Sequence, residues 1–297
     1  MKMGFHTNSL HWAGENSLLS IAKWAIENGF RDMEIGPNWK LDKSLFEKVI
    51  ELGIHPTAFI FCRNILQAEE FRSQIIKRIE FAPAIGIDKI IISSGVNSKA
   101  YLESNPLKYD PEESLADSIE ALKPIIEKAE KHKVKILFEN CPLMGNIMIS
   151  PYMWERFFSQ VDSPYVGLSF DPSHFIWLMM DVYKALEDFM PRIYHVHGKD
   201  CELDREKLSK YGILHTHSLA IKATSEGENS IAKTWWRYRL PGLGNLDWSR
   251  IIAILEKNNY KGTISIEHED PVFDGSLDLV KEGIIMAKKH IESFFGR

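Results

Sequence analysis

The sequence has few of the features that mark secreted or membrane-spanning proteins. It contains only three cysteines in 297 residues and no CxxC spacing, so we expect free thiols in a reducing cytoplasm and no disulfide framework. No apolar run approaches the roughly 20 residues that span a bilayer. The first ten residues, MKMGFHTNSL, become polar too early for the apolar segment of a signal peptide. We therefore expect a cytoplasmic protein without a membrane partner.

Basic charge is also scarce. The 36 lysines and arginines are outnumbered by 41 aspartates and glutamates, and the formal net charge is −5. Because nucleic-acid-binding proteins usually present a basic face, we expect no nucleic-acid partner. Linkers rich in proline, glycine or serine are missing as well, so residues 1–297 are expected to form one domain.

Short strand-like runs alternate with amphipathic, helix-like segments along the chain. SLLSIAKWAIENG and LDWSRIIAILEKNNYKG, for example, repeat apolar residues at the i, i+3, i+4 spacing of helices that pack on one side. The runs expected to form strands are residues 2–8, 31–36, 55–61, 88–94, 134–140, 165–171, 192–199 and 263–268. This order predicts an α/β fold, a single closed (β/α)₈ TIM barrel.

A doubly wound open sheet is the alternative to a barrel. Such a sheet usually has a GxGxxG turn after its first strand, whereas this chain has FHTNSLHWAG there. The one long irregular segment, residues 201–245, separates the seventh and eighth expected strands and is too long for a simple connection. Long loops at the C-terminal ends of barrel strands usually build active sites. We therefore expect a loop insertion that contributes to the site.

The last four expected strands each deliver one ionisable residue to the inside of the barrel. Strand side chains alternate between two faces, and when the apolar residues face the helices, Glu139, Asp171, His197 and Glu267 face inward near the C-terminal strand ends. Three carboxylates so placed would repel one another unless a cation neutralised them. We therefore expect these four residues to bind one divalent metal ion. The oxygen-rich set favours Mn²⁺, with Mg²⁺ or Co²⁺ as alternatives, over tetrahedral zinc.

The segments around these residues resemble those of a known family. LFENCP, LSFDPSH, HVHGKD, YRLPGLGNLDW and ISIEHED are similar to the sugar phosphate isomerase/epimerase family, the xylose-isomerase-like TIM barrels. Keto-sugar 3-epimerases, inosose dehydratase, hydroxypyruvate isomerase and endonuclease IV belong to the same superfamily. The resemblance implies that the same four residues bind the metal and that His197, rather than the deeper His195, is the histidine ligand. The residues that it places at the substrate or at the mouth of the pocket are His174, Lys199, Asp200 and Arg239.

Two positions depart from the pattern of the keto-sugar epimerases. Those enzymes carry an arginine six residues after the ligand histidine, where this chain has Leu203. They also carry a substrate-binding carboxylate shortly after the first ligand glutamate, where this chain has Gly145. Substrate recognition is therefore expected to differ from that of an epimerase of free ketohexoses.

Four other residues are candidates for the lining of the site. His6 and Glu34 point inward on the first two expected strands by the same alternation and are candidates to line the pocket, with His6 expected to contact the substrate. The aromatic residues Trp235 and Trp236 in KTWWRYRLP have two interpretations. They could form a stacking surface for a sugar ring, or they could anchor the long loop.

The expected chemistry is proton transfer next to a sugar carbonyl. A metal ion bound to the carbonyl oxygen and the neighbouring hydroxyl would stabilise the charge that develops when the proton leaves. Glu139 and Glu267, on strands separated by two others, are expected to act as the acid/base pair on the two faces of the substrate. We therefore predict a metal-dependent sugar isomerase or epimerase that acts on a small keto-sugar or sugar derivative, with homo-oligomerisation left open.

Three alternatives remain open at this stage. The same deprotonated sugar could lose a β-substituent, which would make the protein a lyase or dehydratase acting on a 3-keto-glycoside or an inosose. A phosphodiesterase of the endonuclease IV type would need about three clustered metals and a basic groove. A non-catalytic sugar-binding subunit would act beside a second chain.

Overall fold

The computed structural model describes residues 1–97, 110–143, 145–213 and 235–296. Eight parallel strands form a closed barrel in the order β1-β10-β7-β6-β5-β4-β3-β2. The barrel strands are β1 (Lys2–His6), β2 (Asp32–Ile35), β3 (His55–Phe61), β4 (Lys89–Ile92), β5 (Lys135–Glu139), β6 (Val166–Phe170), β7 (Ile193–Gly198) and β10 (Thr263–Ile266). The closed barrel confirms the expected fold class and excludes the open sheet.

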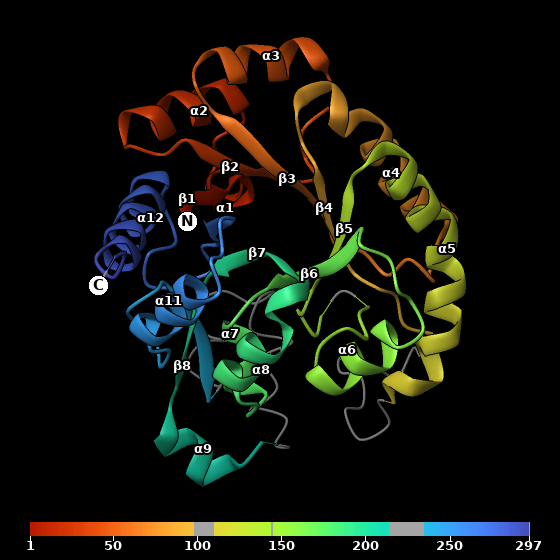
Figure 1. Ribbon diagram of the computed structural model, residues 1–297. Helices are drawn as coiled ribbons and strands as arrows, with labels where there is room; N and C mark the ends of the chain where they lie inside the picture. The colour runs from red at the N-terminus through yellow and green to blue at the C-terminus, as the bar shows by residue number, and fades with distance from the viewer. Residues whose placement is uncertain (98–109, 144, 214–234, 297) are drawn as a thin grey trace.

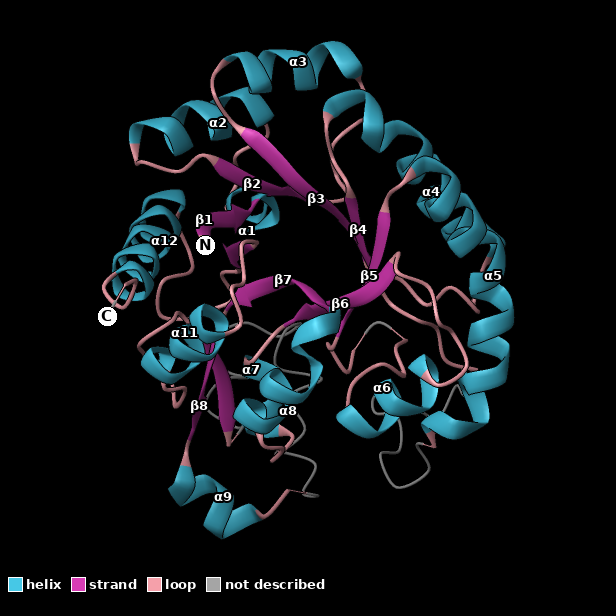
Figure 2. Ribbon diagram, viewed as in Figure 1, coloured by secondary structure: helices cyan, strands magenta, loops and turns pink. Residues whose placement is uncertain are grey.

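Helices surround the barrel strands on the outside (Figure 1, Figure 2). The α-helices outside the segment between β7 and β10 are α1 (Thr7–Trp12), α2 (Leu18–Glu27), α3 (Lys43–Glu51), α4 (Glu69–Phe81), α5 (Leu115–His132), α6 (Pro151–Phe158), α7 (Ser173–Trp177), α8 (Val182–Phe189) and α12 (Leu277–Glu292). Short 3₁₀ helices are η1 (Ala82–Ile85), η3 (Pro111–Ser114) and η4 (Met190–Arg192). Among the described residues, no helix combines the length and the apolar character that a membrane crossing requires.

Local sequence signals explain where many of these helices begin. A serine or aspartate stands at the N-cap, and its side chain accepts a hydrogen bond from a backbone N–H of the first turn. These N-cap residues are Ser17, Asp42, Ser150, Asp181 and Ser276. The first strand is shorter than predicted, because Thr7 and Asn8 already belong to α1.

The interior of the barrel is divided into an apolar side and a polar side. Side chains from β3, β4 and β5, together with Cys62 directly after β3, form an apolar cluster of Ala58, Ile60, Cys62, Ile91 and Leu137. The inward residues of β6, β7 and β10 are instead polar and buried: Ser169, His195, His197 and Ser265. Burying polar groups costs free energy unless they find partners, so this side of the barrel is where a site is expected.

The described part of the chain between β7 and β10 contains two strands and two helices within and after the expected loop insertion. β8 (Asp200–Leu203) and β9 (Trp236–Arg239) form an antiparallel ribbon, with α9 (Arg205–Tyr211) after β8 and α11 (Trp248–Lys257) before β10. Residues 214–234 of the expected insertion lie outside the described residues. The Trp236 ring stacks on the Trp177 ring with centroids 4.4 Å apart and an interplanar angle of 5°. This contact supports the anchoring interpretation of Trp236, because it fixes the ribbon to α7.

Candidate metal centre

Four side chains from neighbouring strands converge at the C-terminal end of the barrel. Glu139, Asp171, His197 and Glu267 each offer one ligand atom, and these atoms all lie within 4.8 Å of one another. Nδ1 of His197 lies 3.2 Å from Oε1 of Glu139, 3.3 Å from Oε2 of Glu267 and 4.0 Å from Oδ2 of Asp171. All four residues are buried. We refer to them as the tetrad.

Each member of the tetrad is positioned by the end of its strand. Glu139 is the last residue of β5, and Asp171 directly follows β6. The Asp171 backbone is fixed by Asn140, whose side chain accepts from its N–H at 2.7 Å and donates to its carbonyl at 2.8 Å. Glu267 directly follows β10, and its backbone N–H donates to the carbonyl of Gly198 at 3.4 Å. Parallel strands therefore bring residues far apart in sequence to one place.

The carboxylates of the tetrad are held ionised by nearby cations. Burial raises the pKa of Asp171, but the charges of His174 and Lys199 overcome this and lower it to about 2. Burial also opposes ionisation of Glu267, whose pKa nevertheless lies well below its usual value because of Lys199 and His197. Adjacent buried carboxylates that stay ionised require compensating positive charge.

The donor set of the tetrad fits a divalent cation. Oδ2 of Asp171 and Nδ1 of His197 are buried and make no hydrogen bond among the described residues, only charge contacts of 3.2 Å or more within the site. Unpartnered polar atoms of this kind are costly, and one cation would satisfy both. Three carboxylates and one imidazole form the oxygen-rich ligand set that Mn²⁺ and Mg²⁺ prefer.

His174, expected at the substrate, lies beside the tetrad on α7. Its Nε2 is 3.2 Å from Oδ2 of Asp171 and 3.9 Å from Oε1 of Glu139. Its Nδ1 is hydrogen-bonded to the hydroxyl of Tyr238 at 2.9 Å. Tyr238 comes from β9, so the ribbon contributes to the site. The role of Tyr238 was not predicted from the sequence, because the ribbon lies in an irregular segment without a regular apolar pattern.

Lys199, also expected at the substrate, is buried between carboxylates and an aromatic ring. Its Nζ lies 3.2 Å from Oε2 of Glu267 and 2.5 Å from Oε2 of Glu269. The same nitrogen is 4.1 Å from the centroid of the Tyr238 ring. Glu269 is a second residue that the sequence analysis missed. It stands two residues after Glu267, so continuing the strand alternation past the end of the strand would have found it.

Asp200 contacts backbone N–H groups and a tryptophan of the following chain segment, and not the residues of the tetrad. Its carboxylate is fully buried and accepts from the backbone N–H groups of Cys201, Gly242 and Leu246 and from Nε1 of Trp248. Burial raises its pKa to about 6 against these four donors. Asp200 therefore holds the chain segment before α11, and its expected place in the lining of the mouth is not supported.

Arg239 and His6 differ in how close they come to the tetrad. Nε of Arg239 donates to Asp270 at 2.8 Å, and its guanidinium also donates to Glu202 at 2.5 Å. The arginine that was expected to reach the substrate thus ties the ribbon to the segment after β10. His6 borders the tetrad, because its Nδ1 lies 3.7 Å from Oε1 of Glu267 and neither ring nitrogen has a hydrogen-bond partner among the described residues.

Comparison with known proteins agrees with this architecture. A sequence model described as xylose isomerase-like TIM barrel matches residues 22–290. The chain belongs to the xylose isomerase-like TIM barrel family. Membership confirms the resemblance found in the sequence.

Relatives and solved structures similar to this chain cover nearly all of it. The uncharacterized protein YfiH of Bacillus subtilis (strain 168) is 30% identical over 308 residues, covering 91% of this chain and 93% of YfiH. Inosose dehydratase of Clostridium perfringens (strain 13 / Type A) is 25% identical, covering 89% of this chain and 85% of that enzyme. The structure of D-psicose 3-epimerase with D-tagatose, from Clostridium cellulolyticum H10, superposes with a TM-score of 0.71 at 14% identity and covers 99% of both chains. At that identity the superposition shows a shared fold.

Proposed function

We propose that this protein is a divalent-metal-dependent sugar isomerase or epimerase that removes a proton next to a carbonyl group. The observation that carries the proposal is the tetrad: three buried carboxylates and one imidazole whose ligand atoms lie within 4.8 Å of one another. Such a concentration of buried negative charge is costly without a cation and is unusual away from functional sites. Mn²⁺ is the proposed ion, and the cytoplasm the proposed compartment.

Glu139 and Glu267 are the proposed acid/base pair. Glu139 ends β5 and Glu267 directly follows β10. Because β6 and β7 separate these strands in the barrel, the two carboxylates approach the centre from different strands. One would take a proton from the substrate carbon and the other would return a proton on a second face or to a neighbouring atom. The bound cation would supply positive charge beside the substrate oxygen on which negative charge develops. Asp171 and His197 would serve as ligands alone.

Residues around the tetrad would orient the substrate. His174 and Lys199 present donors beside Asp171 and Glu267, where sugar hydroxyls would bind. The thiol of Cys62 donates to Oε2 of Glu139 at 3.5 Å, which limits rotation of that carboxylate. These contacts support a site whose catalytic oxygens are positioned before the substrate arrives.

Elimination from the same deprotonated sugar is the second candidate. The relative named inosose dehydratase, at 25% identity over 89% of the chain, favours it. A dehydratase needs the same metal and the same base, and differs in expelling a β-hydroxyl after deprotonation. The net charge of −5 weighs against the phosphodiesterase alternative, and an assembled tetrad weighs against a purely sugar-binding subunit.

Deuterium exchange tests the proposal and separates its two forms. Keto-sugars and inososes would be incubated with the Mn²⁺-loaded protein in D₂O and followed by ¹H NMR. We expect loss of one carbon-bound proton signal that depends on the metal, with an epimer or isomer appearing for the first candidate and a dehydrated product for the second. If no substrate of either class shows exchange or conversion, the proposed activity is wrong.

A further inference from the structure

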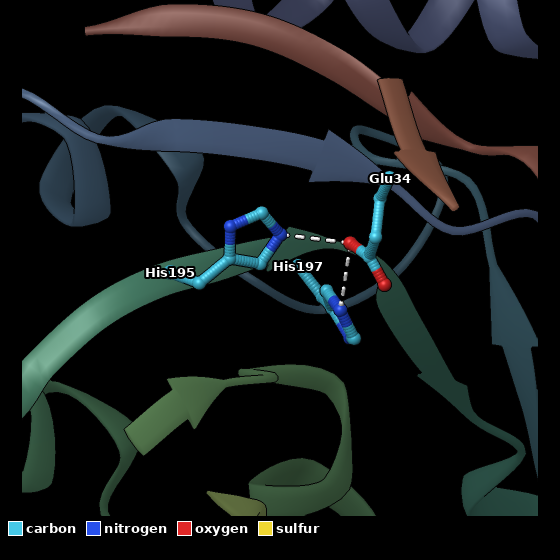
Figure 3. A group of neighbouring side chains, drawn as sticks. All are labelled: Glu34, His195 and His197. Atoms are coloured by element: carbon cyan, nitrogen blue, oxygen red, sulfur yellow. Dashed lines mark hydrogen bonds and ion pairs between the residues drawn. The ribbon is translucent and has the colours of Figure 1, made fainter. Parts of the chain in front are cut away.

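We infer that Glu34 is a positioning residue that orients the His197 ring so that Nδ1 faces the tetrad. The inference rests on the proposed metal centre. Figure 3 shows Glu34 reaching from β2 toward two rings of β7. Oε2 of Glu34 is 2.7 Å from Nε2 of His195 and 3.3 Å from Nε2 of His197. All three side chains are buried away from solvent.

The contact determines which nitrogen of His197 is available to a cation. A carboxylate can only accept, so it favours a hydrogen on Nε2 and leaves the lone pair on Nδ1. Nδ1 is the nitrogen that lies 3.2 Å from Glu139 and 3.3 Å from Glu267. Oε2 of Glu34, 3.3 Å away, is therefore the charged group placed to hold Nε2 of His197, which makes no hydrogen bond to any other group among the described residues. A carboxylate behind a ligand histidine commonly sets its orientation and basicity.

His195 in turn holds Glu34 away from the metal centre. The short hydrogen bond from the His195 imidazole to Oε2 holds the Glu34 carboxylate beside Nε2 of His197 (Figure 3). His195 and His197 lie two residues apart on β7, so both rings point into the barrel and meet edge to face at 5.6 Å. The pair of histidines thus explains why a fully buried glutamate is tolerated beneath the tetrad.

The same three residues could instead bind a second metal ion, since their ligand atoms also cluster within 4.8 Å. The distance of 2.7 Å between Glu34 and His195 argues against this. Two ligand atoms on one ion, each at about 2.1 Å, stand about 3 Å apart or more. A direct hydrogen bond fits the observed distance, and metal stoichiometry distinguishes the two arrangements.

Calorimetric titration of metal-free protein with Mn²⁺ tests the inference in Glu34→Gln. Glutamine keeps the size of the side chain and an accepting oxygen but removes the charge. We expect the dissociation constant to rise about 10–100-fold. The matched control is Ser265→Ala, because Ser265 pairs in register with His197 on the neighbouring strand and its hydroxyl has no partner among the described residues. The control is expected to bind as the wild type does.

A second readout does not depend on affinity or activity. In Zn²⁺-loaded protein with ¹⁵N-labelled histidine, His197 of the wild type is expected to carry its hydrogen on Nε2, and its Nε2–H signal should shift or weaken in Glu34→Gln. If the glutamine variant fails to fold, Glu34→Asp serves instead. It keeps the charge but shortens the reach by one methylene, and it is expected to bind Mn²⁺ more weakly than the wild type.

The outcomes separate this inference from the proposed function. If Glu34→Gln binds Mn²⁺ with wild-type affinity and its His197 Nε2–H signal is unchanged, the inference is wrong, while the proposed metal centre stands. Two ions per wild-type chain and one per Glu34→Gln chain also overturn it, because Glu34 would then be a ligand itself. A wild-type protein that binds no divalent ion removes the metal centre and, with it, the inference.

Discussion

The ammonium group of Lys199 lies 3.2 Å from Oε2 of Glu267, and both side chains are buried. Lys199 directly follows β7 and Glu267 directly follows β10, so two paired strands deliver opposite charges to one point. The same ammonium is 3.6 Å from Oδ2 of Asp171. Lys199 therefore offsets part of the negative charge of the tetrad.

Lys199→Met is expected to move the acidic limb of the pH–activity profile to higher pH, by about one unit. In the wild type, the lysine charge lowers the pKa values of Asp171 and Glu267. Both carboxylates must be ionised to act as ligand or base. Removing the lysine charge raises their pKa values, so they become fully ionised only at higher pH. The measurement is kcat/KM against pH at saturating Mn²⁺. Lys199→Arg, which keeps the charge, should retain the acidic limb, and an unchanged limb in Lys199→Met contradicts the assignment.

Glu267→Gln is expected to keep the fold and to lower turnover by about 10²–10⁴-fold, the usual contribution of a general acid or base. Glutamine fills the same volume but neither removes a proton nor supplies charge to a cation. Turnover and thermal unfolding would be measured on the same preparation. The comparison variant is Glu269→Gln, which alters a carboxylate that contacts Lys199 but lies outside the tetrad. The decrease in turnover of this variant should be far smaller. Full activity in Glu267→Gln would show that the base is another residue.

Asp200→Asn tests the structural role found for Asp200. The amide nitrogen cannot accept, so at least one backbone N–H that Asp200 now satisfies would lose its acceptor. We expect the free energy of unfolding to fall by about 1–3 kcal/mol, measured by urea denaturation. Gly242 and Leu246 lie in the segment that would loosen.

The loss of stability in Asp200→Asn should also depend on pH. The pKa of Asp200 is about 6 in the folded protein and has a reference value of 3.8, so between these values the folded state binds more protons than the unfolded state. The contribution of Asp200 protonation to the free energy of unfolding is therefore largest below about pH 4 and is lost as the pH rises through about 6. Asparagine does not titrate. The stability difference between wild type and variant should be about 1 kcal/mol larger at pH 5 than at pH 8, and equal differences would contradict the raised pKa.

The barrel and the place where the tetrad converges could be predicted because they depend on local patterns. Alternation of side chains in a strand and the order of strands and helices are read directly from the sequence. The sequence alone thus places Glu139 and Glu267 on the inner face. Strand ends were less certain: Thr7 and Asn8 looked extended but begin α1.

Other residues could not be predicted, because their surroundings depend on tertiary packing. Asp200 and Arg239 stand next to residues of the site in sequence, yet their contacts are with backbone N–H groups and with Glu202 and Asp270. These contacts exist only because β8 and β9 pair and dock on α7. Tyr238 reaches His174 for the same reason.

Crystals soaked with Mn²⁺ and measured near the manganese absorption edge test the central claim most directly. We expect one anomalous peak per chain, at about 2.2 Å from one atom each of Glu139, Asp171, His197 and Glu267. A peak that is coordinated elsewhere, or the absence of any peak at saturating Mn²⁺, would contradict the proposed centre and the chemistry built on it.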